Sequence, residues 1–276
     1  MPARIPSRLL HAVAAVLTAA STAACAGPSA NPASGPGFLV VAAENFWGSI
    51  AGQLGGTRVV VRSVIVNPGT DPHSYVPTAA DSRLLAESQM VIVNGIGYDR
   101  WASQGLAANP DPRRVVLDVG ARLGLGTGAN PHQWYAPASV GRIVDAITAD
   151  YTRLDPAGAA YYAARRRAFL TAGLAGYDRM RADIRRRYAG VPVGYSESIF
   201  QPLGEDLGLD LATPASFARA IGEGADVTAQ DKETVDRQAQ TRAIKVWVYN
   251  RQNVTPDVER VNAIVRARQI PIVTIT

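Results

Sequence analysis

The chain has 276 residues, of which 47% are hydrophobic and 18% are charged, and its formal net charge is +5. The length suits one large domain or two lobes, and the apolar content excludes a disordered chain. The single cysteine excludes an intrachain disulfide and a zinc site built from cysteine pairs. Because the chain has only three histidines, a metal site would also have to use carboxylates.

The first 25 residues have the pattern of a bacterial lipoprotein signal peptide. Arg4 and Arg8 precede an apolar run at 9–20, which is shorter than the about 20 residues that span a bilayer. Residues 22–25 resemble a lipobox in which Cys25 would be lipidated, although Thr22 departs from the usual leucine. The alternative is a plain secretory peptide that is cut near Ala24.

Two further features precede or cross the folded part of the chain. Residues 26–37 are rich in Gly, Pro, Ser and Ala, which predicts a flexible tether. The arginine triplets 165–167 and 185–187 lie in a helical pattern, where three successive residues fan around the axis. We therefore expect a solvated helix surface and no binding of nucleic acid.

Short apolar runs alternate with helical patterns over the first half of the folded part. Thr78 and Asp81 have the spacing of a capping box, which marks the start of one helix. The predicted strands are 38–43, 58–66, 90–93 and 115–119, and the predicted helices are 46–54, 78–88 and a helix from Pro137. This alternation predicts βαβ units and a parallel sheet.

No proline interrupts the chain between Pro156 and about Tyr188, and apolar residues recur there at helical spacing. This pattern predicts one helix of about 33 residues, or about 50 Å, which would act as a strut between two lobes. Beyond it, strands are predicted at 191–195, 244–249 and 271–276, and a helix at 199–207. Thr213, followed by Pro214, is predicted to cap a further helix, Thr228 and Asp231 repeat the cap spacing, and Thr255-Pro256 opens the last helix.

The predicted fold class is therefore α/β, with two lobes that each contain a mainly parallel sheet flanked by helices. One long rigid helix joins them. The expected divisions are a signal peptide at 1–25, a tether at 26–37, an N-terminal lobe at 38–154, the linking helix at 155–189 and an incomplete C-terminal lobe at 190–276.

Three candidate metal ligands fall where predicted strands lead into helices. His73 follows Asp71-Pro72, His132 follows Asn130-Pro131, and Glu197 follows the strand 191–195. In open α/β sheets, ligands bind outside the carboxyl ends of the strands. Imidazole and carboxylate groups suit Zn²⁺ or Mn²⁺. Taken singly, however, a loop histidine is more often solvated, and Glu197 more often a salt-bridge partner.

The motifs around these residues closely resemble those of the metal-binding lipoproteins of ABC importers, the zinc- and manganese-type (cluster A-I) substrate-binding proteins. The matching segments are 43–47, 67–75 with Pro77 and Thr78, 94–99 and 130–134. The resemblance extends over residues 38–276 and implies two α/β lobes joined by a long helix. It also implies that His73, His132 and Glu197 are the first, second and third metal ligands.

The chain differs from that family pattern in two places. The loop rich in His and Asp that many zinc members carry is absent, because residues 123–129 are short and glycine-rich. The family's fourth ligand, an Asp or Glu, follows the last strand and would lie beyond Thr276 together with a closing helix. We therefore expect a C-terminally truncated product, with a site completed by water or another group as the alternative.

The resemblance implies an extracytoplasmic receptor, anchored to the bacterial membrane through Cys25, that captures Zn²⁺ or alternatively Mn²⁺. It would deliver the metal to the permease of an ABC importer, and we expect a monomer without enzymatic activity. One alternative is a truncated lipoprotein with a vestigial metal site. Another is a zinc hydrolase, but the chain has no HExxH helix, and only Glu44 is a conceivable general base.

Overall fold

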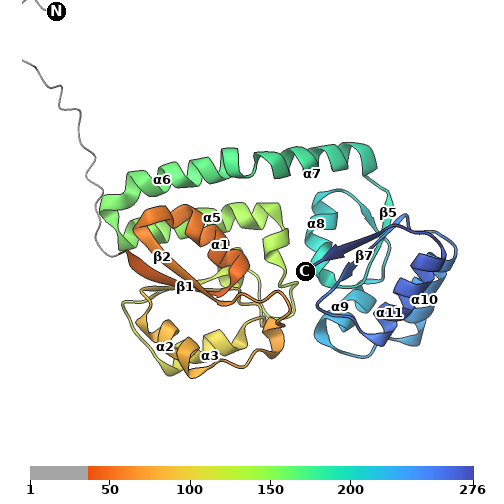
Figure 1. Cartoon of the computed structure of the whole chain (residues 1–276), viewed down its shortest axis with the longest axis horizontal. Coiled ribbons are helices and arrows are strands. Elements are labelled where there is room, and N and C mark those ends of the chain that lie inside the picture. The colour runs from red at the N-terminus through yellow and green to blue at the C-terminus, as the bar shows by residue number, and fades with distance from the viewer. Residues whose placement is uncertain (1–36) are drawn as a thin grey trace, which may run out of the picture. The chain divides into compact units, whose positions relative to one another are not determined.

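A computed structural model describes residues 37–276 of the chain (Figure 1). The predicted signal peptide, Cys25 and residues 26–36 of the predicted tether lie outside the described residues. Within 37–276, none of the helices combines the length and the apolar character that crossing a bilayer requires.

The first lobe is built on a four-stranded parallel sheet with the strand order β2-β1-β3-β4. Strand β1 is central, and its side chains alternate between two cores: Val40 and Ala42 face one side, Val41 and Ala43 the other. Continuous apolar sequence of this kind is typical of a strand buried on both faces. The strands are β1 Phe38–Glu44, β2 Val59–Ile65, β3 Met90–Val93 and β4 Val115–Asp118.

Helices cover both faces of this sheet. The face of Val40 packs against α1 Asn45–Gly55 and α5 Pro137–Leu154, and the other against α2 Ala79–Glu87 and α3 Arg100–Ala108 (Figure 1). A short helix, α4 Val119–Leu123, follows β4 directly. Of these helices, α1, α2 and α5 match helices predicted from the sequence, whereas α3 and α4 were not predicted.

The second lobe repeats the arrangement with the strand order β6-β5-β7-β8, again all parallel. Its strands are β5 Pro192–Tyr195, β6 Asp210–Leu211, β7 Val246–Asn250 and β8 Ile272–Ile275. Its helices are α8 Gln201–Asp206, α9 Ala215–Glu223, α10 Ala229–Gln240 and α11 Pro256–Ala267. Trp247 lies fully buried in this core, and its indole N–H donates to Asn262 Oδ1 at 2.8 Å.

Three of the four predicted helix caps are confirmed. Thr78 and Asp81 form a reciprocal capping box, and Thr228 and Thr255 each accept a hydrogen bond from a backbone N–H in the first turn. The prediction for Thr213 was wrong: α9 begins at Ala215, with Pro214 as its cap residue. The Thr213 hydroxyl instead accepts a hydrogen bond from the backbone N–H of Tyr195 in β5 at 2.9 Å. Both residues are buried, and a buried N–H requires an acceptor.

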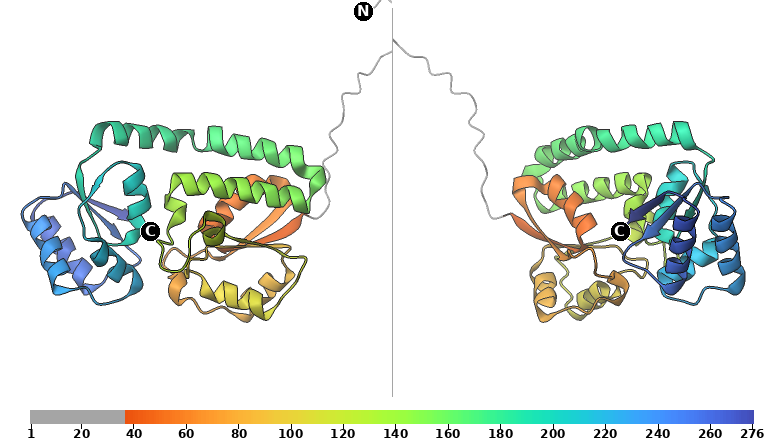
Figure 2. Two further views of the ribbon diagram at one scale, coloured as in Figure 1. Left: turned by 180° about the vertical axis from the view of Figure 1, so that it is seen from behind. Right: turned by 45° about the vertical axis from the view of Figure 1, so that its right-hand side comes forward.

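Helices α6 Ala159–Ala168 and α7 Ala175–Tyr188 follow one another along one side of both lobes (Figures 1 and 2). A π-helical turn, Phe169–Gly173, separates them, so the prediction of one uninterrupted helix was wrong in this detail. The N–H of Leu174 reaches back five residues to the carbonyl of Phe169 at 3.0 Å, which widens the turn while Phe169 packs into the first core. The predicted domain boundaries at 154/155 and 189/190 stay a prediction.

Ion pairs attach this connecting element to the two lobes. Arg166 pairs with Asp145 of α5 at 2.6 Å, and Arg181 pairs with Asp206 of α8 at 2.5 Å. Within the second arginine triplet, Arg186 and Arg187 pair with Asp183 of the same helix. These arginines are therefore engaged by carboxylates of the chain itself.

Candidate metal centre

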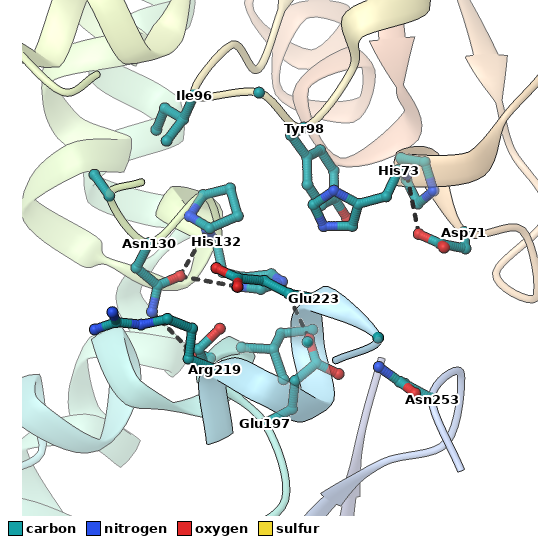
Figure 3. A pocket seen from close by; sticks show the side chains of 18 of the residues that line it. Asp71, His73, Ile96, Tyr98, Asn130, His132, Glu197, Arg219, Glu223 and Asn253 are labelled. Carbon is teal, nitrogen blue, oxygen red and sulfur yellow. Dashed lines mark hydrogen bonds and ion pairs between the residues drawn. The ribbon is translucent and has the colours of Figure 1, made fainter. Parts of the chain in front are cut away.

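A cleft of about 810 Å³ opens between the two lobes, at the carboxyl ends of strands from both sheets. All three predicted ligands line it (Figure 3). His73 lies in a 3-10 turn, Pro72–Ser74, after β2; His132 precedes another, Gln133–Tyr135; and Glu197 comes two residues after β5. The predicted strand-to-helix placement is confirmed for His73 and Glu197, whereas the loop of His132 follows the short helix α4 and leads into α5.

Asn130 determines which nitrogen of His132 carries the proton. The Asn130 side-chain amide donates through Nδ2 to the carbonyl of Ser198 in the second lobe at 2.8 Å, which orients its Oδ1 toward His132. That oxygen lies 2.8 Å from His132 Nδ1 and can only accept, so Nδ1 donates the hydrogen. The unprotonated Nε2 then presents its lone pair, as a metal-binding imidazole requires.

That lone pair faces a carboxylate oxygen. His132 Nε2 and Glu197 Oε1 are 3.5 Å apart, and each side chain is only 5% exposed. Glu197 Oε2 accepts from Asn250 Nδ2 at 2.7 Å, so the carboxylate is held in place from its other side. Burial raises the pKa of Glu197, whereas burial and then the nearby His73 lower the pKa of His132 to about 3.

A neutral imidazole facing a carboxylate is an unfavourable pair unless a cation or a proton lies between them. The low pKa of His132 argues against an imidazolium, so the pair is not an ordinary salt bridge. Two ligands of one tetrahedral Zn²⁺, with bonds of about 2.05 Å, lie about 3.4 Å apart. The observed separation of 3.5 Å therefore fits two ligands of one metal ion.

His73 is not part of that pair in this structure. Its ring packs edge-on against Tyr98 with centroids 4.6 Å apart, and the Tyr98 ring lies 5.9 Å from that of His132. Among residues 37–276, no three His, Cys, Asp or Glu side chains are grouped closely enough to hold a metal ion. His73 keeps contact with solvent, and desolvation by its surroundings lowers its pKa, so its imidazole is neutral at neutral pH.

Below this cleft, two carboxyl groups are buried side by side. Glu44 is 1% exposed, and neither of its oxygens meets a hydrogen-bond donor among the described residues. Asp99 accepts from the backbone N–H groups of Asn94 and Gly95 at 2.5 and 2.9 Å. Burial, reinforced by the charge of Asp99, raises the pKa of Glu44 well above its ordinary value, and burial raises the pKa of Asp99 to about 6. The raised pKa favours the uncharged, protonated form of Glu44, which tolerates burial better than a carboxylate does.

This carboxyl pair supports the loop 94–99, which carries Tyr98. Gly95, Ile96 and Gly97 all have positive φ angles, of 68°, 58° and 81°, so the loop adopts a backbone conformation that side chains disfavour. Glu44 lines a separate, smaller cavity and not the cleft of His132 and Glu197. It is therefore not placed as the general base of a zinc hydrolase.

Sequence reasoning assigned no role to three residues that organise the site: Asn130, Asn250 and Asp99. The asparagine two residues before His132 was a detectable signal, since an Asx side chain commonly bonds to the backbone two residues on, and here it also binds the ring. Asn250 belongs to a strand distant in sequence and had no local signal. Trp134, which follows His132 by two residues, stacks on Phe46 with centroids 3.8 Å apart.

The fold is thus one of two α/β lobes with a cleft between them, which the three candidate metal ligands line. Residues 40–275 match the family model of ZnuA, described as "Zinc-uptake complex component A periplasmic". The chain belongs to this family, which confirms the family predicted from the sequence motifs.

The curated relatives are named after different metals. The chain is 30% identical over 141 residues to the manganese-binding lipoprotein MntA of Halalkalibacterium halodurans, covering 49% of this chain and 46% of the relative. It is 28% identical over 182 residues to the iron-binding protein YfeA of Yersinia pestis, covering 62% of this chain and 57% of the relative. The matches thus span about half the length of these curated relatives.

Solved structures confirm the predicted fold class. The substrate-binding protein FpvC of Pseudomonas aeruginosa, solved in complex with Mn²⁺, superposes with a TM-score of 0.68 at 21% identity. The superposition covers 87% of this chain and 88% of FpvC. At this identity the likeness concerns the fold alone.

Proposed function

We propose that this protein captures a divalent metal ion in the cleft between its lobes and delivers it to the permease of an ABC importer. The proposed protein ligands are His73, His132 and Glu197. The family description, a component of a zinc-uptake complex, supports the transport role. The observation that carries the proposal is the buried approach of His132 Nε2 to Glu197 Oε1 at 3.5 Å.

The proposed cargo is Zn²⁺, with Mn²⁺ as the second candidate. Two imidazoles and one carboxylate are a common ligand set for Zn²⁺. The carboxylate also suits Mn²⁺, and the name of one relative is that of a manganese-binding lipoprotein. In either case the metal neutralises the Glu197 carboxylate and accepts the lone pair of His132.

Metal capture requires His73 to approach the other two ligands. His73 stands on a short turn whose backbone is tied to Asp71, where the carboxylate accepts from the His73 N–H at 3.0 Å. We propose that this turn moves as a unit toward His132 when the metal enters. The Tyr98 ring, which contacts both histidines, would then shift with the loop 94–99.

We propose that the protein acts outside the cytoplasm as a monomer anchored through Cys25. The family description places its members in the periplasm, and the MntA relative is named as a lipoprotein. An anchor keeps a receptor near its membrane permease, and residues 26–37 would link the anchor to the folded part of the chain.

Equilibrium titration of the metal-free protein tests this function. Zn²⁺ and Mn²⁺ are added in competition with a fluorescent chelator to the parent, His132→Ala and Glu197→Gln, with Glu87→Gln on the exposed end of α2 as the matched control. We expect the parent and the control to bind one ion per chain and both cleft variants to lose most of their affinity. A parent that binds neither metal, or cleft variants that bind like the parent, would contradict the proposal.

A further inference from the structure

We infer that Glu223 is an additional metal-binding residue. It lies at the end of helix α9 in the second lobe and lines the same cleft as His132 and Glu197. This inference rests on the proposed function and adds a residue to the same site. It concerns a residue to which neither the sequence motifs nor the resemblance assigned a role.

Glu223 occupies a position where a carboxylate is normally unfavourable. It is the last residue of α9, and Gly224 ends the helix in a left-handed conformation with φ 65°. The carboxyl end of a helix carries a partial negative charge, which favours lysine and arginine there and disfavours an acid. A cation bound at this end would compensate for that cost.

The end of α9 lies directly against the proposed metal ligand Glu197. A Cβ atom added to Gly222 would lie 3.2 Å from Glu197 Cγ and 3.5 Å from Glu197 Oε1. Glycine at this position therefore permits the close approach of the helix end to the ligand. The next residue, Glu223, lines the same cleft as His73 and His132, and Figure 3 draws its carboxylate within that cleft.

No cation of the described chain neutralises Glu223. Arg219 precedes it by one helical turn and also lines the cleft, yet no ion pair or hydrogen bond joins the Glu223 side chain to Arg219 or to any other residue of 37–276. Glu223 is thus an exposed acid without a side-chain partner in the cleft that His73, His132 and Glu197 also line.

Charge balance indicates what Glu223 would contribute. If its ligands are two neutral imidazoles and the single carboxylate of Glu197, a divalent ion keeps one positive charge that these ligands do not compensate. A second carboxylate would make the centre neutral and add an oxygen ligand, which favours Mn²⁺ more than Zn²⁺. Glu223 would therefore affect the choice of metal as well as the affinity.

The alternative role for Glu223 is that of a solvated acid which occasionally pairs with Arg219. The test compares Glu223→Gln with Arg219→Gln, whose side chain comes from the same helix and lines the same cleft. Each metal-free protein is titrated with Zn²⁺ and with Mn²⁺ in competition with a chelator, and its thermal unfolding is followed with and without metal.

We expect Glu223→Gln to weaken Mn²⁺ binding by about tenfold or more and Zn²⁺ binding by a smaller factor. Without metal, it should unfold at the parent's temperature or higher, because an acid at the helix end has been removed. Arg219→Gln should bind both ions at least as tightly as the parent. If Glu223→Gln binds both metals like the parent while His132→Ala does not, the role of Glu223 is overturned and the proposed function stands. If the parent binds no metal, both fail.

Discussion

His132 Nε2 and Glu197 Oε1 face one another at 3.5 Å across the interface between the two lobes. His132 comes from the first lobe and Glu197 from the second, so any cation that joins these atoms also joins the lobes. The long connecting helices hold the same two lobes from the far side through the ion pairs of Arg166 and Arg181. Metal binding is therefore expected to stabilise the closed arrangement of the lobes.

The Asn130 side chain should be essential for metal affinity without touching the metal. Asn130→Ala removes both the acceptor that fixes the His132 tautomer and the bond to Ser198 in the second lobe. We expect metal affinity to fall by about 10- to 100-fold in a competitive titration. Asn109→Ala, at an exposed helix end, is the control and should bind like the parent. Equal binding by the two variants would show that the imidazole needs no such partner.

Gly95 should be required for the stability of the loop beneath the cleft. Gly95→Ala places a Cβ in a left-handed backbone conformation and 2.2 Å from Asp118 Oδ1, so we expect a loss of about 2–4 kcal/mol in the free energy of unfolding. Gly124 has a similar φ but nothing within 4 Å of the added Cβ. Gly124→Ala should therefore lose only about 1–2 kcal/mol. Urea denaturation checks both, and equal losses would show that the contact with Asp118 does not matter.

The buried acids Glu44 and Asp99 should make stability depend on pH. Burial raises the pKa of both groups, that of Asp99 to about 6, so the folded protein holds protons that the unfolded chain releases above about pH 4. Their stabilising contribution is complete below that pH and is lost as the pH rises through the folded-state values.

Glu44→Gln removes one of these titrating groups and isolates its effect. Its free energy of unfolding should increase relative to that of the parent as the pH is raised from about 5 to about 8, because the parent loses this contribution and the variant does not. Denaturant titrations at several pH values measure this difference, with Glu87→Gln at the exposed end of α2 as the control. A Glu44→Gln difference that stays constant with pH would show that Glu44 does not retain a proton in the folded state.

Local patterns predicted most of the fold because they reflect local physical causes. The apolar run of β1 is buried on both faces, and the Thr-to-Asp spacing at Thr78 forms the expected capping box. The failures have causes that are distant in sequence. Thr213 bonds to β5 instead of capping α9, and the π-helical turn at Phe169–Gly173 accompanies the packing of Phe169 into the first core. Strand β6 has two residues, too few for a hydrophobic pattern.

The candidate site was predictable to a similar degree. Topology placed His73, His132 and Glu197 at one cleft, and all three line it. Their shared role as ligands stays a prediction, since His73 contacts Tyr98 and does not approach the other two closely in this structure. The contributions of Asn250 and Glu223 depend on how the second lobe folds against the first, which no local spacing reveals.

The central claim is that one metal ion bridges His132 and Glu197. Crystals of the protein loaded with Zn²⁺ and measured on both sides of the zinc absorption edge locate that ion directly. We predict one anomalous peak in the cleft, about 2.0–2.2 Å from both His132 Nε2 and Glu197 Oε1. A fully occupied zinc ion bound elsewhere, with these two atoms still facing one another without it, would contradict the account.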